Sequence, residues 1–443
     1  MAAYQLASSG CDVVVLERSE RVGGLAGSFV VGGQRVDHGS HRLHPTIAPP
    51  VLDVLRGLLG HDLQHRPRRG RMRVAGRWVG FPPRPLDLVR RLPPPVAARL
   101  AVDVAAGPLR RAPRTDTFDA VVRARLGPTL LEEFYAPYVR KIWGTEPEAL
   151  SGELARRRVG ASSGALLRRL TARRGIDRGA FLYPRTGFGT IVERLAEAAV
   201  GAGAVIRLGA EVEAIAPGDS GATVTAGGRT LDASFVLSTI PITALVERIR
   251  PQLPPPVLES ARHLEFRALV LVYLVLPVER FTSFDAHYVP GAEARFARVS
   301  EPKNYRDGPD PQDRSVLCAE IPCAVGDDMW NASDHELAQV VVAGIAALGL
   351  PAARFGEVAT RRIARAYPVY SLGFEHDFAT VDDALTAMPR LLTFGRQGLF
   401  AHDNTHHAMN MAVAAAGAVT DEGLDSSRWS AARSEFAAHV VED

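Results

Sequence analysis

The sequence predicts an α/β fold in which a first domain, assembled from separate stretches of chain, is interleaved with a second domain of α+β type, a mixed sheet with helices. Three observations predict this. A helix pattern at 2–8 leads into a continuous apolar strand at 13–16, and helical and β patterns return together at 181–246. A long β-rich run at 268–276 begins a different sheet, and a last strand and helix follow near 391–419.

The bulk composition is that of an ordinary globular protein. Its 443 residues are enough for two or three domains of roughly 150 residues each. The net charge of +3 gives no reason to expect a nucleic-acid partner. Only three cysteines occur, which suits a reducing compartment. The N-terminus has no signal-peptide pattern, so we expect a cytoplasmic protein, and the dominance of Arg and Ala is typical of bacterial genes rich in G and C.

The first element pair has the order helix, strand, acidic residue. Residues 2–8 are good helix formers, and Gly10 suits the position that ends a helix. Val13 to Leu16 form a short apolar run, which predicts a parallel strand buried on both faces. Glu17 stands at the carboxyl end of that strand. This is the second half of a βαβ unit.

The remaining elements follow from their periodicity. Residues 45–180 are mostly helical in pattern, with proline clusters at 82–85 and 93–95. Further along, the patterns predict helices at 190–199, 334–348 and 404–419 and strands at 204–208, 210–216, 221–226, 234–238, 268–276 and from 391.

Glu17 and the paired glycines after it suggest a dinucleotide site. A carboxylate at the end of the second strand of such a fold has the two acceptors that both ribose hydroxyls need. Gly23 and Gly24 lack a Cβ, so their backbone N–H groups can approach a pyrophosphate closely. Taken alone, Glu17 is better explained as a solvated charge at the end of a strand, and the paired glycines after it shift the balance toward a dinucleotide site.

The stretch from Val14 to Leu25 resembles the flavoprotein superfamily of amine oxidases, protoporphyrinogen oxidases and UDP-galactopyranose mutases. That resemblance implies a Rossmann-like FAD-binding domain interleaved with a substrate domain. We therefore predict an FAD domain from residues 1–45, 181–246 and 385–443, a helical insertion at 46–180 and a substrate domain of sheet and helices at 247–384.

Further stretches extend the resemblance to about residue 420. Residues 39–44 resemble a G-x-H-x-x-H loop beside the flavin ring, and residues 138–144 resemble a K-x-W-G segment of the mutases. Residues 395–396 and 404–409 resemble a C-terminal segment whose backbone amides face the flavin, and 235–241 resemble the return strand. The implied cofactor-binding residues are Glu17, Arg18, Gly23, Gly24, Leu25, Gly39, Ser40, Val212, Thr239, Gly395, Asn404, Ala408 and Met409.

The same resemblance suggests residues for chemistry and substrate. The predicted catalytic residues are His41, His44 and Arg396. The predicted substrate residues are Lys141, Trp143, Tyr183, Arg298, Asn304 and Phe400.

Each motif also has a structural interpretation. His41 and His44 could be a hydrogen-bonded pair in a turn, and Lys141 could be a stem packed on an aromatic ring. Asn404 suits a helix N-cap without any flavin. Asp403 with His402, His406 and His407 suggests metal ligands, but adjacent histidines point apart on a helix, so we predict no metal site.

Two departures from the family pattern bear on function. The expected first strand and G-x-G-x-x-G loop do not occur, because Met1 already lies in the following helix. We expect about 15 residues of strand and loop upstream, and weak FAD occupancy in a chain that starts at Met1. Phe400 and His402 stand where the mutases have two tyrosines for the nucleotide diphosphate, whereas Arg396 still suits a carboxylate or phosphate.

Three functional hypotheses remain. The first is an FAD-dependent oxidoreductase acting on a small metabolite, with an anionic group as one option. The alternatives are a flavin-dependent pyranose–furanose mutase of a nucleotide sugar, and a flavin-free, non-catalytic relative. The partner is expected to be a small-molecule substrate. The basic segment 86–112 is interpreted as a solvated face, with contact to an anionic membrane as the alternative, and the sequence leaves the oligomeric state open.

Overall fold

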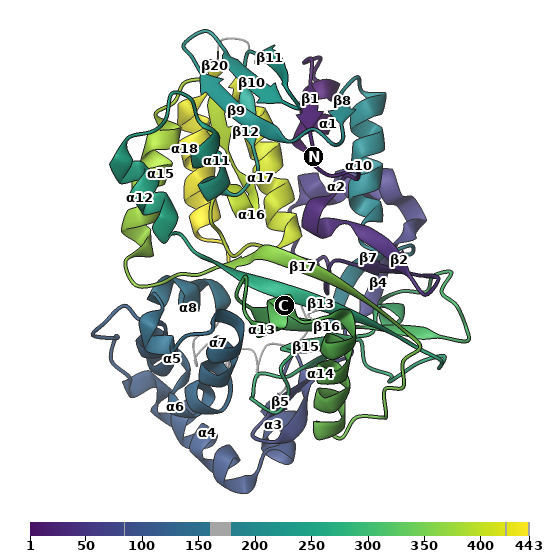
Figure 1. Ribbon diagram of the computed structural model, residues 1–443. Coiled ribbons are helices and arrows are strands. Elements are labelled where there is room, and N and C mark those ends of the chain that lie inside the picture. Colours follow the sequence, from purple (N-terminus) through teal and green to yellow (C-terminus); the bar gives the residue numbers. More distant parts are fainter. Residues whose placement is uncertain (84, 160–178, 421–422, 442–443) are drawn as a thin grey trace.

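The computed structural model describes residues 1–83, 85–159, 179–420 and 423–441. Two long strands, β13 (Phe266–Leu276) and β17 (Glu357–Pro368), cross the middle of the molecule. The predicted nucleotide-binding elements lie on one side of them, and a group of helices from the first half of the chain lies on the other (Figure 1).

The first α/β unit forms as predicted, with one exception. Helix α1 (Ala2–Ser8) leads through Gly10, at φ +90°, into β1 (Val14–Leu16). Strand β1 pairs in parallel with β8 (Val205–Arg207), which follows α10 (Thr190–Gly201). The expected burial of β1 on both faces is wrong, because Val14 is 45% exposed and its partner Val205 is 50% exposed. Within the described residues β1 has one strand neighbour, so the pair has the burial of a sheet edge.

A second parallel pair carries the C-terminal part of this unit. Strand β12 (Val236–Ser238) pairs with β18 (Leu391–Thr393), and α17 (Thr405–Ala418) and α18 (Ser426–Ala437) pack beside it. The alanines of α17 are small enough to bring the helix close to the strands. A separate antiparallel sheet contains β9 (Val212–Pro217), β10 (Ala222–Ala226) and β11 (Arg229–Ala233), of which β11 was not predicted.

The largest sheet has seven strands in the order β17-β13-β16-β15-β14-β5-β6. Strand β13 is interior, as predicted, and its side chains alternate between two cores. Val270, Val272 and Leu274 pack toward α14 (Asp334–Ala347). Leu271 and Tyr273 pack on the hairpin of β2 (Ser28–Val31) and β3 (Gln34–Asp37). The other five members are β5 (Gly70–Val74), β6 (Arg77–Phe81), β14 (Ala286–Tyr288), β15 (Arg298–Ser300) and β16 (Ser315–Cys323).

The expectation that residues 45–180 are mostly helical is only partly right. Strands β4 (Leu63–Pro67), β5 (Gly70–Val74) and β6 (Arg77–Phe81) occur near its start. Strand β5 alternates buried and half-buried residues, a period-two pattern that the many arginines obscure in the sequence. Residues 160–178 of the predicted insertion lie outside the described residues. The helices are α2 (Pro49–Leu59), α3 (Pro85–Arg91), α4 (Pro94–Ala106), α5 (Phe118–Leu126), α6 (Pro128–Leu130), the π-turn η4 (Leu131–Tyr135), α7 (Ala136–Trp143) and α8 (Gly152–Arg158).

One hydrophobic core joins these helices to the nucleotide-binding elements. It contains Phe118 and Leu154 from the helical region together with Leu245 and Leu385 from the second half of the chain. The division into three domains stays a prediction. No helix of the described residues has both the length and the apolar character that crossing a bilayer requires. The remaining elements are β7 (Ala180–Pro184), α11 (Ile242–Arg248), α12 (Pro255–His263), α13 (Asp328–Asn331), α15 (Phe374–Thr386), α16 (Gly395–Gly398), β19 (Val419–Thr420) and β20 (Gly423–Leu424).

Candidate active site

A single large cavity runs between the nucleotide-binding elements, the seven-stranded sheet and the helices α3 to α7. Its volume is about 2300 Å³. An ordinary small-molecule site occupies roughly 300 to 1000 Å³, so this cavity has room for more than one such molecule. Twelve of the thirteen predicted cofactor residues and all three predicted catalytic residues line it, although they come from segments almost 400 residues apart in the chain.

We call the first part of the cavity the nucleotide end, defined by Glu17, Gly23, Gly24, Thr239 and Gly395. The Glu17 carboxylate stands at the carboxyl end of β1, where the Ser19 N–H and hydroxyl both donate to its Oε1 at 2.8 Å. These two bonds hold the carboxylate in place at the wall of the cavity. The carboxylate's remaining acceptor capacity suits a sugar hydroxyl.

The two glycines at the nucleotide end, Gly23 and Gly24, are needed for different reasons. A Cβ on Gly23, at φ +108°, would lie 2.6 Å from Cγ2 of Val192 on α10. A Cβ on Gly24, at φ +51°, would meet no heavy atom within 4 Å. Gly23 therefore permits helix packing, whereas the backbone of Gly24 faces open space in the cavity. Only the second position fits close approach by a ligand.

The loop 39–41 is tied to the seven-stranded sheet by one carboxylate. The Ser40 N–H donates to Oε1 of Glu320 at 3.0 Å. Both carboxylate oxygens of Glu320 also accept from Nη2 of Arg298, at 2.8 Å each. Glu320 is only 4% exposed. Burial acts to lower the pKa of Arg298, but the adjacent Glu320 carboxylate outweighs it and raises this pKa, so Arg298 is a permanent cation.

The two predicted catalytic histidines line the cavity but do not pair with each other. His41 donates through Nε2–H to the carbonyl of His38 at 3.0 Å and stacks on Phe188. Burial lowers the pKa of His41, so its imidazole is neutral near pH 7. His44 instead forms its hydrogen bond with the hydroxyl of Thr46, at 2.7 Å from Nδ1. The interpretation of a hydrogen-bonded histidine pair is therefore wrong.

Two further arginines converge on the ring of Tyr367. The guanidinium carbon of Arg396 lies 5.3 Å from the ring centroid, and that of Arg158 lies 5.8 Å from it. Arg396 donates to the carbonyl of Ala366 at 2.7 Å, but its buried Nε–H has no hydrogen-bond partner among the described residues. Such a group costs free energy unless a ligand satisfies it. With Arg298 these residues form what we call the arginine group: Arg158, Arg298 and Arg396.

His402 sits beside the arginine group as a neutral base. Its Nε2–H donates to the carbonyl of Pro368 at 2.8 Å, so Nδ1 carries the lone pair, 3.4 Å from the Arg158 guanidinium. Burial, then the charges of Arg158 and Arg396, lowers the pKa of His402 well below its usual value. The Trp143 N–H donates to the same Pro368 carbonyl at 3.2 Å. Trp143 lines the cavity, as predicted for a substrate residue.

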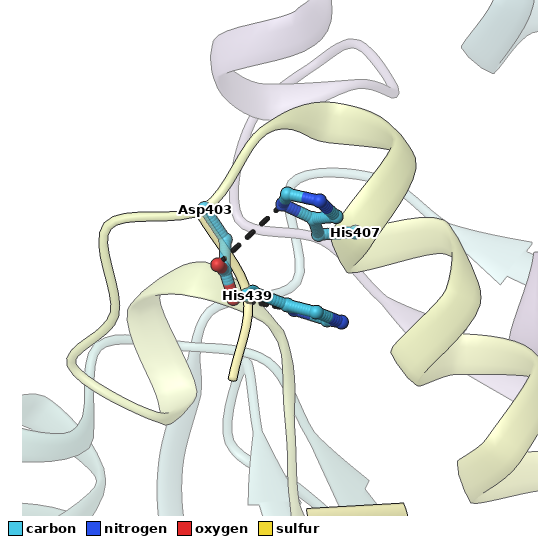
Figure 2. A group of neighbouring side chains, drawn as sticks. All are labelled: Asp403, His407 and His439. Atoms are coloured by element: carbon cyan, nitrogen blue, oxygen red, sulfur yellow. Dashed lines mark ion pairs between the residues drawn. The ribbon is translucent and has the colours of Figure 1, made fainter. Parts of the chain in front are cut away.

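Asp403 and two histidines form a cluster at the start of α17 (Figure 2). The rings of His407 and His439 stack on each other at 4.2 Å between centroids, and their Nδ1 atoms lie 3.6 and 3.5 Å from the oxygens of the Asp403 carboxylate beside them. The Arg157 guanidinium lies 3.8 Å from the same carboxylate. Burial alone would raise the pKa of Asp403, but the two histidines lower it below its usual value. His439 was missed because it is remote in sequence. These three residues together could hold a metal ion. The Arg157 cation beside the carboxylate opposes an added positive charge, and the lone pair of His407 Nδ1 already accepts the Asn404 N–H.

Five predicted site residues lie away from the cavity wall, and each has a structural explanation. Phe400 packs on Phe266 and Tyr370 in the main core. Met409 lies on the face of α17 that is buried in another hydrophobic cluster. Tyr183 is fully buried, and its hydroxyl donates to Asp37. These contacts do not support a substrate role for Phe400 and Tyr183 or a cofactor contact by the Met409 side chain, and those roles stay predictions.

The other two of these five residues use their polar atoms inside the protein. The Lys141 ammonium donates to the carbonyls of Val289 and Phe296 at 2.7 and 3.2 Å. The Asn304 amide donates to the carbonyls of Thr282 and Phe284 at 2.9 and 2.8 Å. These contacts do not support the substrate role predicted for both, which stays a prediction. A polar motif in sequence does not reveal which backbone carbonyls it will satisfy.

The sequence analysis missed Glu320 and Arg158 as site residues. Glu320 was detectable, because it is the only charged residue in the apolar run Ser315–Cys323. A lone carboxylate in a buried strand needs a partner. Arg158 gave no such signal, since it ends a run of three arginines on α8.

The fold and this cavity define an α/β protein with a nucleotide-type binding site between its first α/β unit and its seven-stranded sheet. The sequence profile of the family described as flavin containing amine oxidoreductase matches residues 1–418, and the chain belongs to that family. Comparison with curated protein sequences finds no match.

Three solved structures illustrate the similarity in fold. A reduced UDP-galactopyranose mutase superposes with a TM-score of 0.78 at 19% identity, over 94% of this chain and 90% of the other. A putative protoporphyrinogen oxidase from Exiguobacterium sp. 255-15 gives 0.69 at 20% identity, over 98% and 95%. A putrescine oxidase bound to putrescine gives 0.62 at 18% identity, over 93% and 95%. The expected superfamily is thus confirmed.

FAD is the cofactor of this family, and the cavity fits it. Gly24 leaves the open approach that a phosphate group needs, and the Glu17 carboxylate provides acceptors for a ribose. At the far side of the same cavity, Asn404 begins α17, and Asn404, Thr405 and Ala408 line the wall. A helix N-terminus offers unpaired N–H groups to polar atoms. The residues that would hold FAD are Glu17, Gly24, Gly39, Ser40, Thr239, Gly395, Asn404 and Ala408.

Proposed function

We propose that this chain is an FAD-dependent oxidoreductase whose substrate carries an anionic group. The observation that carries the proposal is the single cavity that links the nucleotide end to the arginine group. When bound, the flavin would accept a hydride from a C–H bond next to nitrogen or oxygen in the substrate. The protein's own task is then to bind, orient and enclose that substrate.

The arginine group supplies the binding charge. Arg298 is neutralised by Glu320, but Arg158 and Arg396 add positive charge around Tyr367. The unsatisfied Nε–H of Arg396 is a donor suited to a carboxylate or phosphate oxygen. His41 and His402 are neutral, so neither repels a cationic neighbour nor competes for the anion.

An absorption spectrum and an anaerobic reduction test the proposal. Purified protein incubated with FAD and freed of excess cofactor should retain the visible bands of a bound flavin. Anaerobic addition of the substrate should bleach these bands, and oxygen or another acceptor should restore them. The test uses the chain from Met1 and a longer chain that includes the expected upstream strand and glycine loop. A longer protein that still emerges colourless from this treatment contradicts the proposal.

The second candidate is a flavin-dependent pyranose–furanose mutase. The histidines of the 39–44 loop and Trp143 line the cavity, which favours it. Against it, Phe400 is buried in the core and the His402 side chain is held by Pro368 and Arg158. Conversion of UDP-galactopyranose only after the flavin is reduced, with no consumption of an electron acceptor, would support the mutase and exclude the oxidoreductase.

A further inference from the structure

The cavity has a second compartment that the proposed function does not use. Beyond Tyr288 it continues between the β5–β6 hairpin and the helices, where apolar side chains form its wall. We call this compartment the apolar lobe; its wall contains Met72, Val74, Leu88, Leu92, Leu130 and Phe134. All six belong to one hydrophobic cluster with Val79 and Leu100 behind them, so the wall is supported by packed core.

Two rows of aromatic rings lead from the apolar lobe to the arginine group. In one row Phe81 contacts Tyr288 at 4.5 Å between ring centroids, and the guanidinium carbon of Arg298 lies 5.5 Å from the centroid of the Tyr288 ring. On the opposite side Phe134 stacks on Tyr138 at 5.8 Å, and the Tyr138 hydroxyl accepts from Arg158 at 3.4 Å. The apolar compartment therefore opens directly onto two cations.

A site with an apolar wall at one end and cations at the other matches one kind of molecule. We infer that the substrate is amphipathic, with an anionic group at the arginine group and an extended apolar part in the apolar lobe. This inference rests on the proposed function, because it names the substrate of the same cavity. The volume supports it, since about 2300 Å³ exceeds what one ordinary ligand site occupies and leaves space beyond the cofactor. Apolar wall area gains free energy only when an apolar group covers it.

Arg68 is a cation on the cavity wall close to the apolar lobe. Its guanidinium lies 5.8 Å from the ring centroid of Phe81, on the cavity wall. The six residues that define the lobe carry no charge. The substrate's apolar part would therefore lie past Phe81, with its anionic end directed toward Arg298 and Arg158.

Calorimetric titration of the FAD-loaded protein tests the inference with simple probes. Dodecanoate and butanoate have the same carboxylate and differ by eight methylenes. Burial of one methylene strengthens binding by about fourfold, so burial of four of the eight predicts dodecanoate binding more than 100-fold tighter than butanoate at one site per chain. Dodecylamine, with the same chain and the opposite charge, should bind at least tenfold more weakly than dodecanoate.

Variants locate the site. Leu88→Glu places a charge in the wall of the apolar lobe and should weaken dodecanoate at least tenfold while leaving butanoate unchanged. The control is Val102→Glu on α4, because Val102 is 67% exposed and its substitution should change neither titration. The wild-type chain-length comparison needs no variant, so it remains decisive if Leu88→Glu fails to fold.

The outcomes separate this inference from the proposed function. Protein that binds FAD but takes butanoate and dodecanoate with equal affinity overturns the apolar lobe as a substrate site. Equal binding of dodecylamine and dodecanoate overturns the anionic end. Protein that does not bind FAD overturns the proposed function, and the same titrations on it still report whether the apolar lobe binds a chain.

Discussion

The nucleotide end of the cavity is built mainly from backbone and short motifs, whereas its substrate end is built from side chains of distant segments. At the nucleotide end, Glu17 and Gly24 act within one stretch of eight residues. At the substrate end, Ser40, Arg298 and Glu320 meet from three parts of the chain. Local motifs reveal the first kind of site in sequence, and only folding assembles the second.

The largest expected effect lies at the substrate end. Glu320→Gln leaves the buried Arg298 cation without its counter-charge, which should cost about 3–5 kcal/mol of unfolding free energy. Urea unfolding monitored by circular dichroism measures it. Glu132→Gln is the matched control, because the Glu132–Arg99 pair is exposed and should contribute less than about 1 kcal/mol. Equal losses in the two variants would show that Glu320 does not hold the substrate end together.

The two glycines sharpen the comparison within the nucleotide end. Gly23→Ala should lower the unfolding free energy by about 1–3 kcal/mol, because its Cβ collides with Val192. Gly24→Ala should change stability less and weaken FAD binding at least tenfold. Unfolding without cofactor and FAD titration by flavin fluorescence separate the two effects. Wild-type FAD affinity in Gly24→Ala would remove this glycine from the cofactor site.

A pH effect should come from His287 in the seven-stranded sheet. Burial, with the charge of Arg71, lowers the pKa of His287 to about 3. The unfolded chain takes up a proton near pH 6.5 and the folded chain does not, so stability falls as pH drops from about 6.5 toward 3. Between pH 7.5 and 5.0 this group should cost about 2 kcal/mol.

The free energy of unfolding is measured for His287→Gln and for the wild type at pH 7.5 and 5.0. The difference between the two pH values should be smaller in the variant by the contribution of His287. His61→Gln, at an exposed position, is the control and should leave the pH dependence unchanged. An unchanged dependence in His287→Gln would mean that His287 is protonated in the folded protein.

The smallest of these effects is expected at Glu17. Glu17→Gln keeps the size of the side chain but weakens the acceptors for a ribose, so FAD affinity should fall by about tenfold, or ~1.4 kcal/mol. Stability without FAD should barely change, because the Glu17 carboxylate is hydrogen-bonded only to its neighbour Ser19 within the described residues, and the backbone bonds of Glu17 do not depend on its side chain. Glu197→Gln on α10 serves as control, because the Glu197 side chain is exposed and does not line the cavity. A loss of stability without a loss of FAD affinity would assign Glu17 a purely structural role.

Sequence patterns located most elements, most of the predicted site residues lie on the cavity wall, and the departures share a cause. Strands β4 to β6 were missed because arginines mask their alternation, and β1 is more exposed than its apolar run suggests. Lys141, Tyr183 and Asn304 were predicted to meet substrate, yet each satisfies a buried partner elsewhere in the protein. Polarity in sequence shows that a side chain needs a partner and does not say which one.

The sequence by itself determined the family, the flavin cofactor and the glycine-containing turns of the nucleotide end. Those features depend on residues close together in the chain, whose spacing fixes their geometry. Tertiary structure alone decided that Glu320 joins Ser40 to Arg298, that His439 approaches Asp403, and that an apolar lobe opens beside the arginine group. Such contacts depend on how sheets and helices pack across hundreds of residues, which no local pattern encodes.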